Sequence, residues 1–255
     1  MNMETNISWT ERTWNPITGC TQFSEACKNC YAKKIASSFQ IGGMNGYENG
    51  FEVTMHDYRL NKPAKWYGSW LIFVCSMSDI FHEDVPFEFV DKIMNVITNV
   101  APRHTYQLLT KRAERMAEYF STRSVPQNVW LGVTVENKRA KYRIDILRNI
   151  EAPLRFLSCE PLLEDLGKLD LTDIHWVIVG GEKVDEDIRK ARPMSGWWAL
   201  SIEKQATLQG ALFHFKQWGN YGRDGVLRPA YKNGSLWKGR ICQPIPYVNR
   251  HTLFG

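Results

Sequence analysis

The sequence predicts an α/β protein whose core is a partial or full barrel of about six or seven parallel strands. From residue 70 onward, short apolar runs rich in β-branched and aromatic residues alternate with amphipathic stretches, which is typical of a parallel sheet. No glycine-rich phosphate-binding motif follows any run, so a barrel is favoured over an open dinucleotide-binding sheet. At 255 residues, 44% of them hydrophobic, the chain is expected to form one domain.

The elements follow from composition and periodicity along the chain. A short strand is expected at 7–14, before a loop that carries three cysteines. The polar segment at about 40–69 is interpreted as an insertion with one strand at 51–55, and the stretch at about 220–255 as a C-terminal extension over one face. The other strands are expected at 70–75, 104–109, 129–135, 154–158, 175–179 and 211–216. Helices are expected at 89–97, 113–120, 138–147 and 197–208.

Charge and hydropathy limit the class of protein. Lys and Arg number 32 against 27 Asp and Glu, a net charge of +5, and the pI of about 8.8 favours a polyanionic partner. No basic leader precedes an apolar stretch, and no window is apolar enough for a membrane helix, so we expect a soluble, cytoplasmic protein. Cys75, Cys159 and Cys242 lie far apart and are expected to be reduced core residues.

Cys20, Cys27 and Cys30 fall within eleven residues. Cysteines this close together, without a secretion signal, favour a metal or an iron–sulfur cluster over disulfides. Three ligands leave one coordination position for a substrate, water or cofactor. A closed zinc site with a histidine stays open, although the nearest downstream histidine is His56. A nucleophilic thiol is less favoured because no histidine lies nearby in the sequence.

Polar residues end the predicted strands, where parallel barrels carry their active sites. Side chains alternate along a strand, so Thr134 shares a face with Glu136, Ser158 with Glu160, Gly180 with Glu182, and Lys216 with Trp218. If these faces point inward, Glu136, Glu160 and Glu182 converge on one mouth, with Lys111, Arg192 and Lys216 as cationic counterparts. The same parity sends Cys159 outward.

The sequence resembles a three-cysteine-motif family of phages and bacteria, of largely undetermined function, which is itself similar to the radical S-adenosylmethionine enzymes. The resemblance covers almost the whole chain. It is carried by TWNPITGC (13–20), CKNCYA (27–32), CSMSDIFHEDVP (75–86), LTKR (109–112), WLGVTVEN (130–137), LSCEPL (157–162), WVIVGGE (176–182), ARP (191–193) and FKQWG (215–219).

The resemblance implies the barrel architecture of radical S-adenosylmethionine enzymes. It also implies a [4Fe–4S] cluster on Cys20, Cys27 and Cys30, with S-adenosylmethionine on the open iron. One electron from an external donor, flavodoxin-like or ferredoxin-like, would then yield a 5′-deoxyadenosyl radical that abstracts hydrogen from a substrate. Cofactor-binding residues are expected to be Tyr31, Ser76, Ser78, Asp79, Thr110, Lys111, Thr134, Ser158 and Arg192. Catalytic residues are expected to be Glu136, Glu160, Glu182 and Lys216.

A nucleic acid is the expected substrate, for base modification or lesion repair. The basic balance, the aromatic content and the phage setting of the resemblance favour it. Arg223, Arg228, Lys232, Lys238 and Arg240 in the C-terminal extension are expected to hold its phosphates. Two alternatives stay open, namely a cluster-containing or zinc-containing nucleic-acid-binding protein without radical turnover, and a zinc-stabilised hydrolase.

Two departures from the resembled pattern concern the site. Radical enzymes usually space their cysteines C-x3-C-x2-C, whereas six residues separate Cys20 from Cys27 here. An additional segment at 183–190 separates Glu182 from the ARP motif and is expected to alter the substrate mouth.

Overall fold

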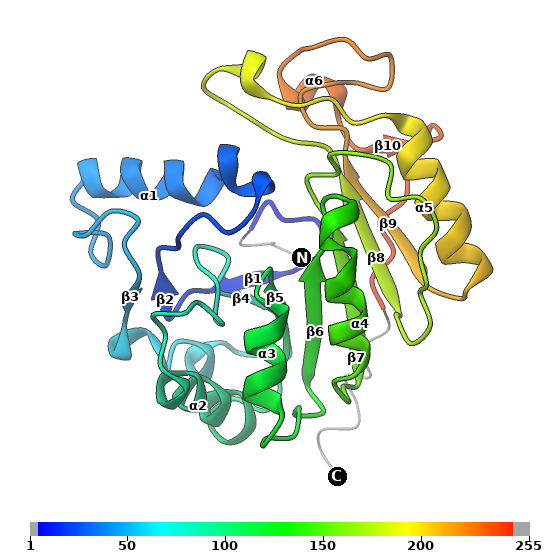
Figure 1. The fold of residues 1–255 in the computed structure, drawn as a ribbon. Helices are drawn as coiled ribbons and strands as arrows, with labels where there is room; N and C mark the ends of the chain where they lie inside the picture. The colour runs from blue at the N-terminus through cyan, green and yellow to red at the C-terminus, as the bar shows by residue number, and fades with distance from the viewer. Residues whose placement is uncertain (1–4, 247–255) are drawn as a thin grey trace.

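Seven parallel strands form the central sheet, in their order along the chain (Figure 1). The structure is a computed structural model that describes residues 5–246. The strands are β1 (Arg12–Trp14), β4 (Leu71–Val74), β5 (Thr105–Thr110), β6 (Val129–Thr134), β7 (Leu154–Cys159), β8 (Trp176–Gly180) and β9 (Leu212–Gln217). Each pairs in parallel with the next. The predicted α/β fold with a parallel sheet is confirmed, and its order rules out a doubly wound arrangement.

The sheet curls into a half-barrel around Trp9. The Trp9 ring centroid lies 4.6 Å from that of Phe73 in β4 and 6.5 Å from that of Trp176 in β8. Ser8 Oγ lies 3.0 Å from His214 Nε2 in the edge strand β9. The first predicted strand is therefore shorter than expected, because Trp9 turns into the barrel interior instead of extending β1. Its neighbours there are Leu71, Phe73, Trp130, Leu154, Phe156, Trp176 and Ile178.

Four helices cover the outer face of the sheet: α2 (Phe87–Asn95), α3 (Ala113–Phe120), α4 (Tyr142–Arg148) and α5 (Gly196–Leu208). They occupy the predicted positions. A π-helical segment, η4 (Val96–Val100), follows α2, and a 3-10 helix, η5 (Lys138–Lys141), precedes α4. Their apolar stripes join the outward strand residues in one large core, which includes Cys159 as the strand parity predicted. Burial of these stripes is the main force that holds the helices on the sheet.

The segment between β1 and β4 contains a helix that the sequence did not predict, α1 (Tyr31–Ile41). Its only buried residues are Ala32 and Ala36, so no large apolar stripe marks it. The strand expected at 51–55 is reduced to β3 (Thr54–Met55), which pairs antiparallel with β2 (Ile17–Thr18). Two short turns, η2 (Asp57–Arg59) and η3 (Pro63–Lys65), lead to β4.

The C-terminal segment packs along the edge strand β9. It contains α6 (Ala230–Asn233) and a hairpin of β10 (Leu236–Trp237) and β11 (Arg240–Ile241). Phe215 N donates to Cys242 O at 2.7 Å, and the Trp237 ring centroid lies 4.7 Å from that of Phe215. Cys242 is only half-buried there, unlike Cys75 and Cys159. This segment therefore covers one of the two open edges of the half-barrel.

One strand-parity prediction is wrong. Lys216 and Trp218 do not share a face, because the β8–β9 register shifts and pairs Gly180 with Gln217 after Val179 with Phe215. This bulge interrupts the alternation. Trp218 packs on Phe215 in the outer core.

No helix among residues 5–246 is long and apolar enough to cross a membrane.

Candidate active site

The three cysteines lie on a loop that is fixed to the carboxyl ends of the strands. We call residues 20–30 the cysteine loop. Gly19, with φ of 82°, precedes it, and a Cβ at this position would lie 2.0 Å from Glu52 O. Only glycine fits there, so the chain can turn closely under the insertion. Cys20 N donates to Phe51 O at 3.1 Å, Cys27 lies in η1 (Glu25–Asn29), and Cys30 precedes α1.

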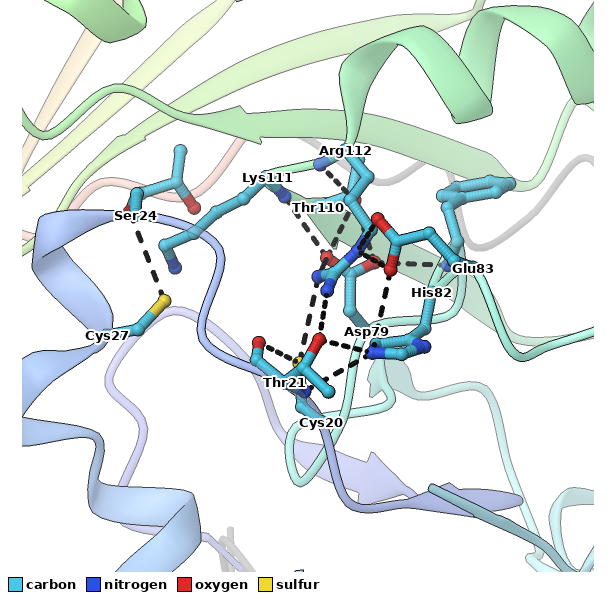
Figure 2. Close-up of polar contacts among 12 residues, drawn as sticks. Cys20, Thr21, Ser24, Cys27, Asp79, His82, Glu83, Thr110, Lys111 and Arg112 are labelled. Carbon is cyan, nitrogen blue, oxygen red and sulfur yellow. Dashed lines mark hydrogen bonds and ion pairs between the residues drawn. The ribbon is translucent and has the colours of Figure 1, made fainter. Parts of the chain in front are cut away.

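Arg112, the second residue after β5, reaches the start of the cysteine loop (Figure 2). Its Nη1 donates to Cys20 Sγ at 3.7 Å, and its Nη2 donates to Thr21 Oγ1 at 3.1 Å. His82 Nε2 lies 2.7 Å from the same threonine oxygen. The first cysteine is thereby joined to the ends of two neighbouring strands.

Buried Asp79 balances the charge of Arg112. Arg112 is 3% exposed, and its Nη1 donates to Asp79 Oδ2 at 3.2 Å. Thr110 Oγ1 donates to Asp79 at 2.7 Å, and Phe81 N donates to the same carboxylate at 3.0 Å. Arg112 Nε is also 2.8 Å from both oxygens of Glu83. Charges this deeply buried are tolerated because each has several partners.

Two of the cysteine thiols have different electrostatic surroundings. Burial and the Asp79 carboxylate raise the pKa of Cys20 to about 11, although Arg112 opposes the shift. Burial also acts to raise the pKa of Cys27, but the ammonium of Lys111 and backbone groups of Ser24 and Phe23 outweigh it, so the pKa is lowered. Figure 2 shows the Lys111 side chain extended toward Cys27. Lys111 thus faces a cysteine and not one of the predicted acids.

Glu182, after β8, fixes the opposite end of the cysteine loop. Its carboxylate pairs with the Arg192 guanidinium and accepts from Arg192 N at 2.8 Å. Asn29 Nδ2 donates to Glu182 Oε2 at 3.1 Å, and Arg192 Nη1 donates to Glu25 O at 3.1 Å. The Arg192 side chain lowers the pKa of Glu182 against the opposing effect of burial, so the carboxylate stays charged.

The other two predicted catalytic acids have separate cationic partners. Glu160 pairs with Lys216 beside Gly180, at the end of the barrel interior. Glu136 Oε2 accepts from Arg143 Nη1 at 2.9 Å, and both side chains are almost fully buried. Glu136 Oε1 and Arg143 Nε have no hydrogen-bond partner among the described residues. Each acid is therefore neutralised in place instead of sharing one group of cations.

Several residues expected to bind a cofactor already have partners within the chain. Ser76 Oγ bonds Asn15 Oδ1 at 3.2 Å, and Ser78 Oγ donates to Ile17 O at 3.0 Å. Tyr31 Oη donates to Ser76 O at 2.6 Å from the first turn of α1. Thr134 and Ser158 are buried and face each other across the β6–β7 register. These residues lie at the same end of the sheet as the cysteine loop.

Sequence patterns did not identify some of the residues that hold the site. The Phe23 ring lies 4.9 Å from Cζ of Arg112 and 5.4 Å from Cζ of Arg143, so it sits against two guanidinium groups. The sequence likewise predicted no role for Thr21, Asn29, His82 and Arg143. They lie on loops or on a helix, where no period marks a contact with a strand end.

The residues present fit an iron–sulfur cluster in their chemistry. All three cysteines are free and partly exposed, and two have a cation beside their sulfur. Among residues 5–246, no three His, Cys, Asp or Glu side chains come close enough to hold one metal ion.

A hollow of about 560 Å³ borders the loop at Cys20. Thr21, Lys33, Phe51, Glu52, Val53 and Asp84 form the rest of its lining. It gives the first cysteine access from the side of the insertion.

Comparisons with known proteins gave matches to solved structures and to a family model. Two solved structures of spore photoproduct lyase are similar at 10% identity. One is a variant with bound AdoMet and dinucleoside spore photoproduct, with 78% of this chain and 61% of that chain covered and a TM-score of 0.41. The other is complexed with dinucleoside spore photoproduct, with 75% and 59% covered and a TM-score of 0.40. The chain thus spans about three fifths of their length.

None of the curated proteins matches the chain. A family model matches residues 4–246, which is nearly the whole sequence. The chain therefore belongs to the family described as proteins of unknown function, DUF5131.

Proposed function

We propose that the chain is a radical S-adenosylmethionine enzyme that binds a [4Fe–4S] cluster through Cys20, Cys27 and Cys30. One observation carries the proposal: three free thiols lie on a loop fastened across the carboxyl ends of a parallel half-barrel, the end at which such barrels carry their chemistry. When bound, the cluster and S-adenosylmethionine would supply a 5′-deoxyadenosyl radical, given one electron from an external donor.

The chain's own residues would then place and shield the reacting groups. Arg112 and Lys111 provide positive charge beside two of the thiolates, which reduces repulsion among three negative ligands. The Glu160–Lys216 pair lies at the end of the barrel interior, and Glu182 with Arg192 closes the far end of the loop. Tyr31, Thr134 and Ser158 are the candidates for contact with the cofactor. The aromatic cluster around Trp9 fills the barrel below and keeps water out of the mouth from that side.

Anaerobic reconstitution with iron and sulfide tests the cluster. The protein should acquire a broad brown absorption that dithionite bleaches, and should convert S-adenosylmethionine to 5′-deoxyadenosine. Cys20→Ala, Cys27→Ala and Cys30→Ala should each abolish both properties. Cys242→Ala is the matched control, because that thiol is also free and partly exposed but lies beside β9.

The outcomes separate the proposal from its alternatives. A colourless protein that holds one zinc through the same cysteines would support the zinc-stabilised hydrolase. A stable cluster without 5′-deoxyadenosine would support a binding protein without turnover. Either result would overturn the proposal.

For the substrate we propose a nucleic acid, modified or repaired at a base. The net charge of +5 and the exposed aromatic residues Tyr67, Trp197 and Tyr231 are consistent with it. An enzyme that acts on a base must take it out of the stack, and phosphate contacts must hold the strand meanwhile. Labelled DNA and RNA, single-stranded and duplex, should bind with an affinity that falls as salt rises.

A further inference from the structure

We infer that Arg112 is a positioning residue that holds the Cys20 sulfur and raises the reduction potential of the cluster. This role rests on the proposed function, because it concerns a cluster on the cysteine loop. Arg112 lies outside the three ligands, and the sequence predicted no role for it.

The contacts of Arg112 form a fork between the barrel and the loop (Figure 2). On the barrel side, it donates to Asp79 and to both oxygens of Glu83. On the loop side, it donates to Cys20 Sγ and to Thr21 Oγ1. A buried guanidinium bonded to both sides leaves the sulfur little freedom to move, because any displacement would break charge-assisted hydrogen bonds.

The same contacts bear on the reduction potential. Reduction adds a negative charge to a cluster, and a cation or an N–H donor at a ligand sulfur stabilises that added charge. Arg112 supplies both at Cys20. Removing Arg112 would also leave Asp79 buried without its counter-ion, which adds negative field at the same place. Loss of the N–H donor and the unpaired Asp79 carboxylate would therefore both lower the reduction potential.

Arg143 provides a matched comparison within the same site. It is also buried, pairs with the buried acid Glu136, and its Cζ lies 5.4 Å from the centroid of the same Phe23 ring. No hydrogen bond joins Arg143 to a cysteine within residues 5–246. The two arginines therefore share a structural environment and differ in the contact with the Cys20 sulfur.

The experiment uses Arg112→Lys and Arg143→Lys in the full chain. Lysine keeps the charge and loses the planar fork, so both variants are expected to fold. The readouts are the cluster's potential, by redox titration without S-adenosylmethionine, the rate of iron loss to a chelator, and thermal unfolding of the metal-free protein. Arg112→Lys should lower the potential and weaken iron retention about tenfold. Arg143→Lys should change thermal stability and leave the potential as in the parent chain.

A second variant guards against misfolding. Arg112→Met with Asp79→Asn removes the guanidinium and its buried partner together, so no buried charge is left unpaired, and the Glu83 carboxylate that also loses its partner is half exposed to solvent. Its potential should also fall below that of the parent chain. Equal potentials and iron retention in the parent chain and both Arg112 variants would overturn the role of Arg112 while the proposed function stands. If the parent chain holds no cluster, both fail.

Discussion

Arg192 donates twice to one oxygen of Glu182, from its backbone N at 2.8 Å and from Nε at 3.0 Å. Asn29 of the cysteine loop donates to the same oxygen at 3.1 Å. One carboxylate after β8 thus joins two segments that are far apart in the sequence.

Glu182→Ala should loosen the cysteine loop while the half-barrel stays folded. Charge-assisted hydrogen bonds contribute about 1.5–3 kcal/mol each, so the local opening free energy should fall by at least that amount. Hydrogen exchange at residues 20–30 in the metal-free protein measures it, with faster exchange expected there and unchanged exchange in β5 and β6. Arg189→Ala is the control, because Arg189 is in the same segment but within residues 5–246 its side chain pairs only with Asp187. Equal exchange in both variants would contradict the anchoring role.

Two buried histidines predict how stability depends on pH. Burial lowers the pKa of His104 and of His214 to about 4. His104 Nδ1 accepts from Trp70 N at 3.2 Å, and its Nε2 lies 3.0 Å from Pro63 O, so the proton is on Nε2. His214 has the opposite tautomer, because Nδ1 lies 3.2 Å from Pro244 O and Nε2 faces the Ser8 hydroxyl. Both rings are therefore neutral in the folded chain.

In the unfolded chain these two histidines take up protons near pH 6.5, whereas in the folded chain they stay neutral until about pH 4. The free energy of unfolding should therefore decrease as the pH falls through this window, by up to about 1.4 kcal/mol per pH unit for each histidine. Denaturant titrations from pH 7.5 to 4 measure the slope. His104→Gln and His214→Gln should each be less stable at pH 7 and show a shallower slope. An unchanged slope in both variants would refute this assignment of the pH dependence.

Gly132→Ala should destabilise the barrel interior. A Cβ there would lie 2.4 Å from the buried Phe156 ring, which is the register partner across β6 and β7. Overpacking of this kind costs about 1–3 kcal/mol. Chemical denaturation of the metal-free protein should show this loss, with partial recovery in Gly132→Ala combined with Phe156→Leu. Gly180→Ala is the control, because its Cβ would make only ordinary contacts at 3.5 Å. A neutral Gly132→Ala would mean that the ring moves aside without cost.

The fold could be predicted because buried strands and helices show characteristic hydrophobic patterns in the sequence. Strands such as β6 are buried on every residue and read as continuous apolar runs, and α2 has a broad apolar stripe. Helix α1 was not predicted because its fully buried residues are two alanines, which do not form a strong apolar stripe. The face on which Trp218 lies was predicted wrongly, because a bulge changes strand parity without leaving a periodic signal in the sequence.

The site could be predicted only in part. Cys20, Cys27 and Cys30 are close in sequence, and the polar strand ends mark the correct edge of the sheet. Which charged side chains pair with each other in the site depends on which loop crosses which strand end. Nothing in the spacing pairs Glu136 with Arg143 rather than Lys111, or places Arg112 at Cys20. Long side chains reach several neighbours, so such pairings need the tertiary arrangement.

The C-terminal extension gives the last prediction, because the structure divides its cations into paired and unpaired ones. Lys238 lies 2.5 Å from Glu203, and Arg228 lies 2.6 Å from Asp224. Lys232 is exposed and has no carboxylate partner among residues 5–246. If the extension holds phosphates, Lys232→Ala should reduce the slope of log affinity against log salt by about 0.7 to 0.9, since each phosphate contact releases counter-ions. Lys238→Ala removes the same charge and should reduce the slope less, because its ammonium is already neutralised. Fluorescence anisotropy of labelled oligonucleotides from low to physiological salt measures both slopes. An equal reduction in both variants would indicate a response to net charge alone, and the extension would then not be the phosphate-binding surface.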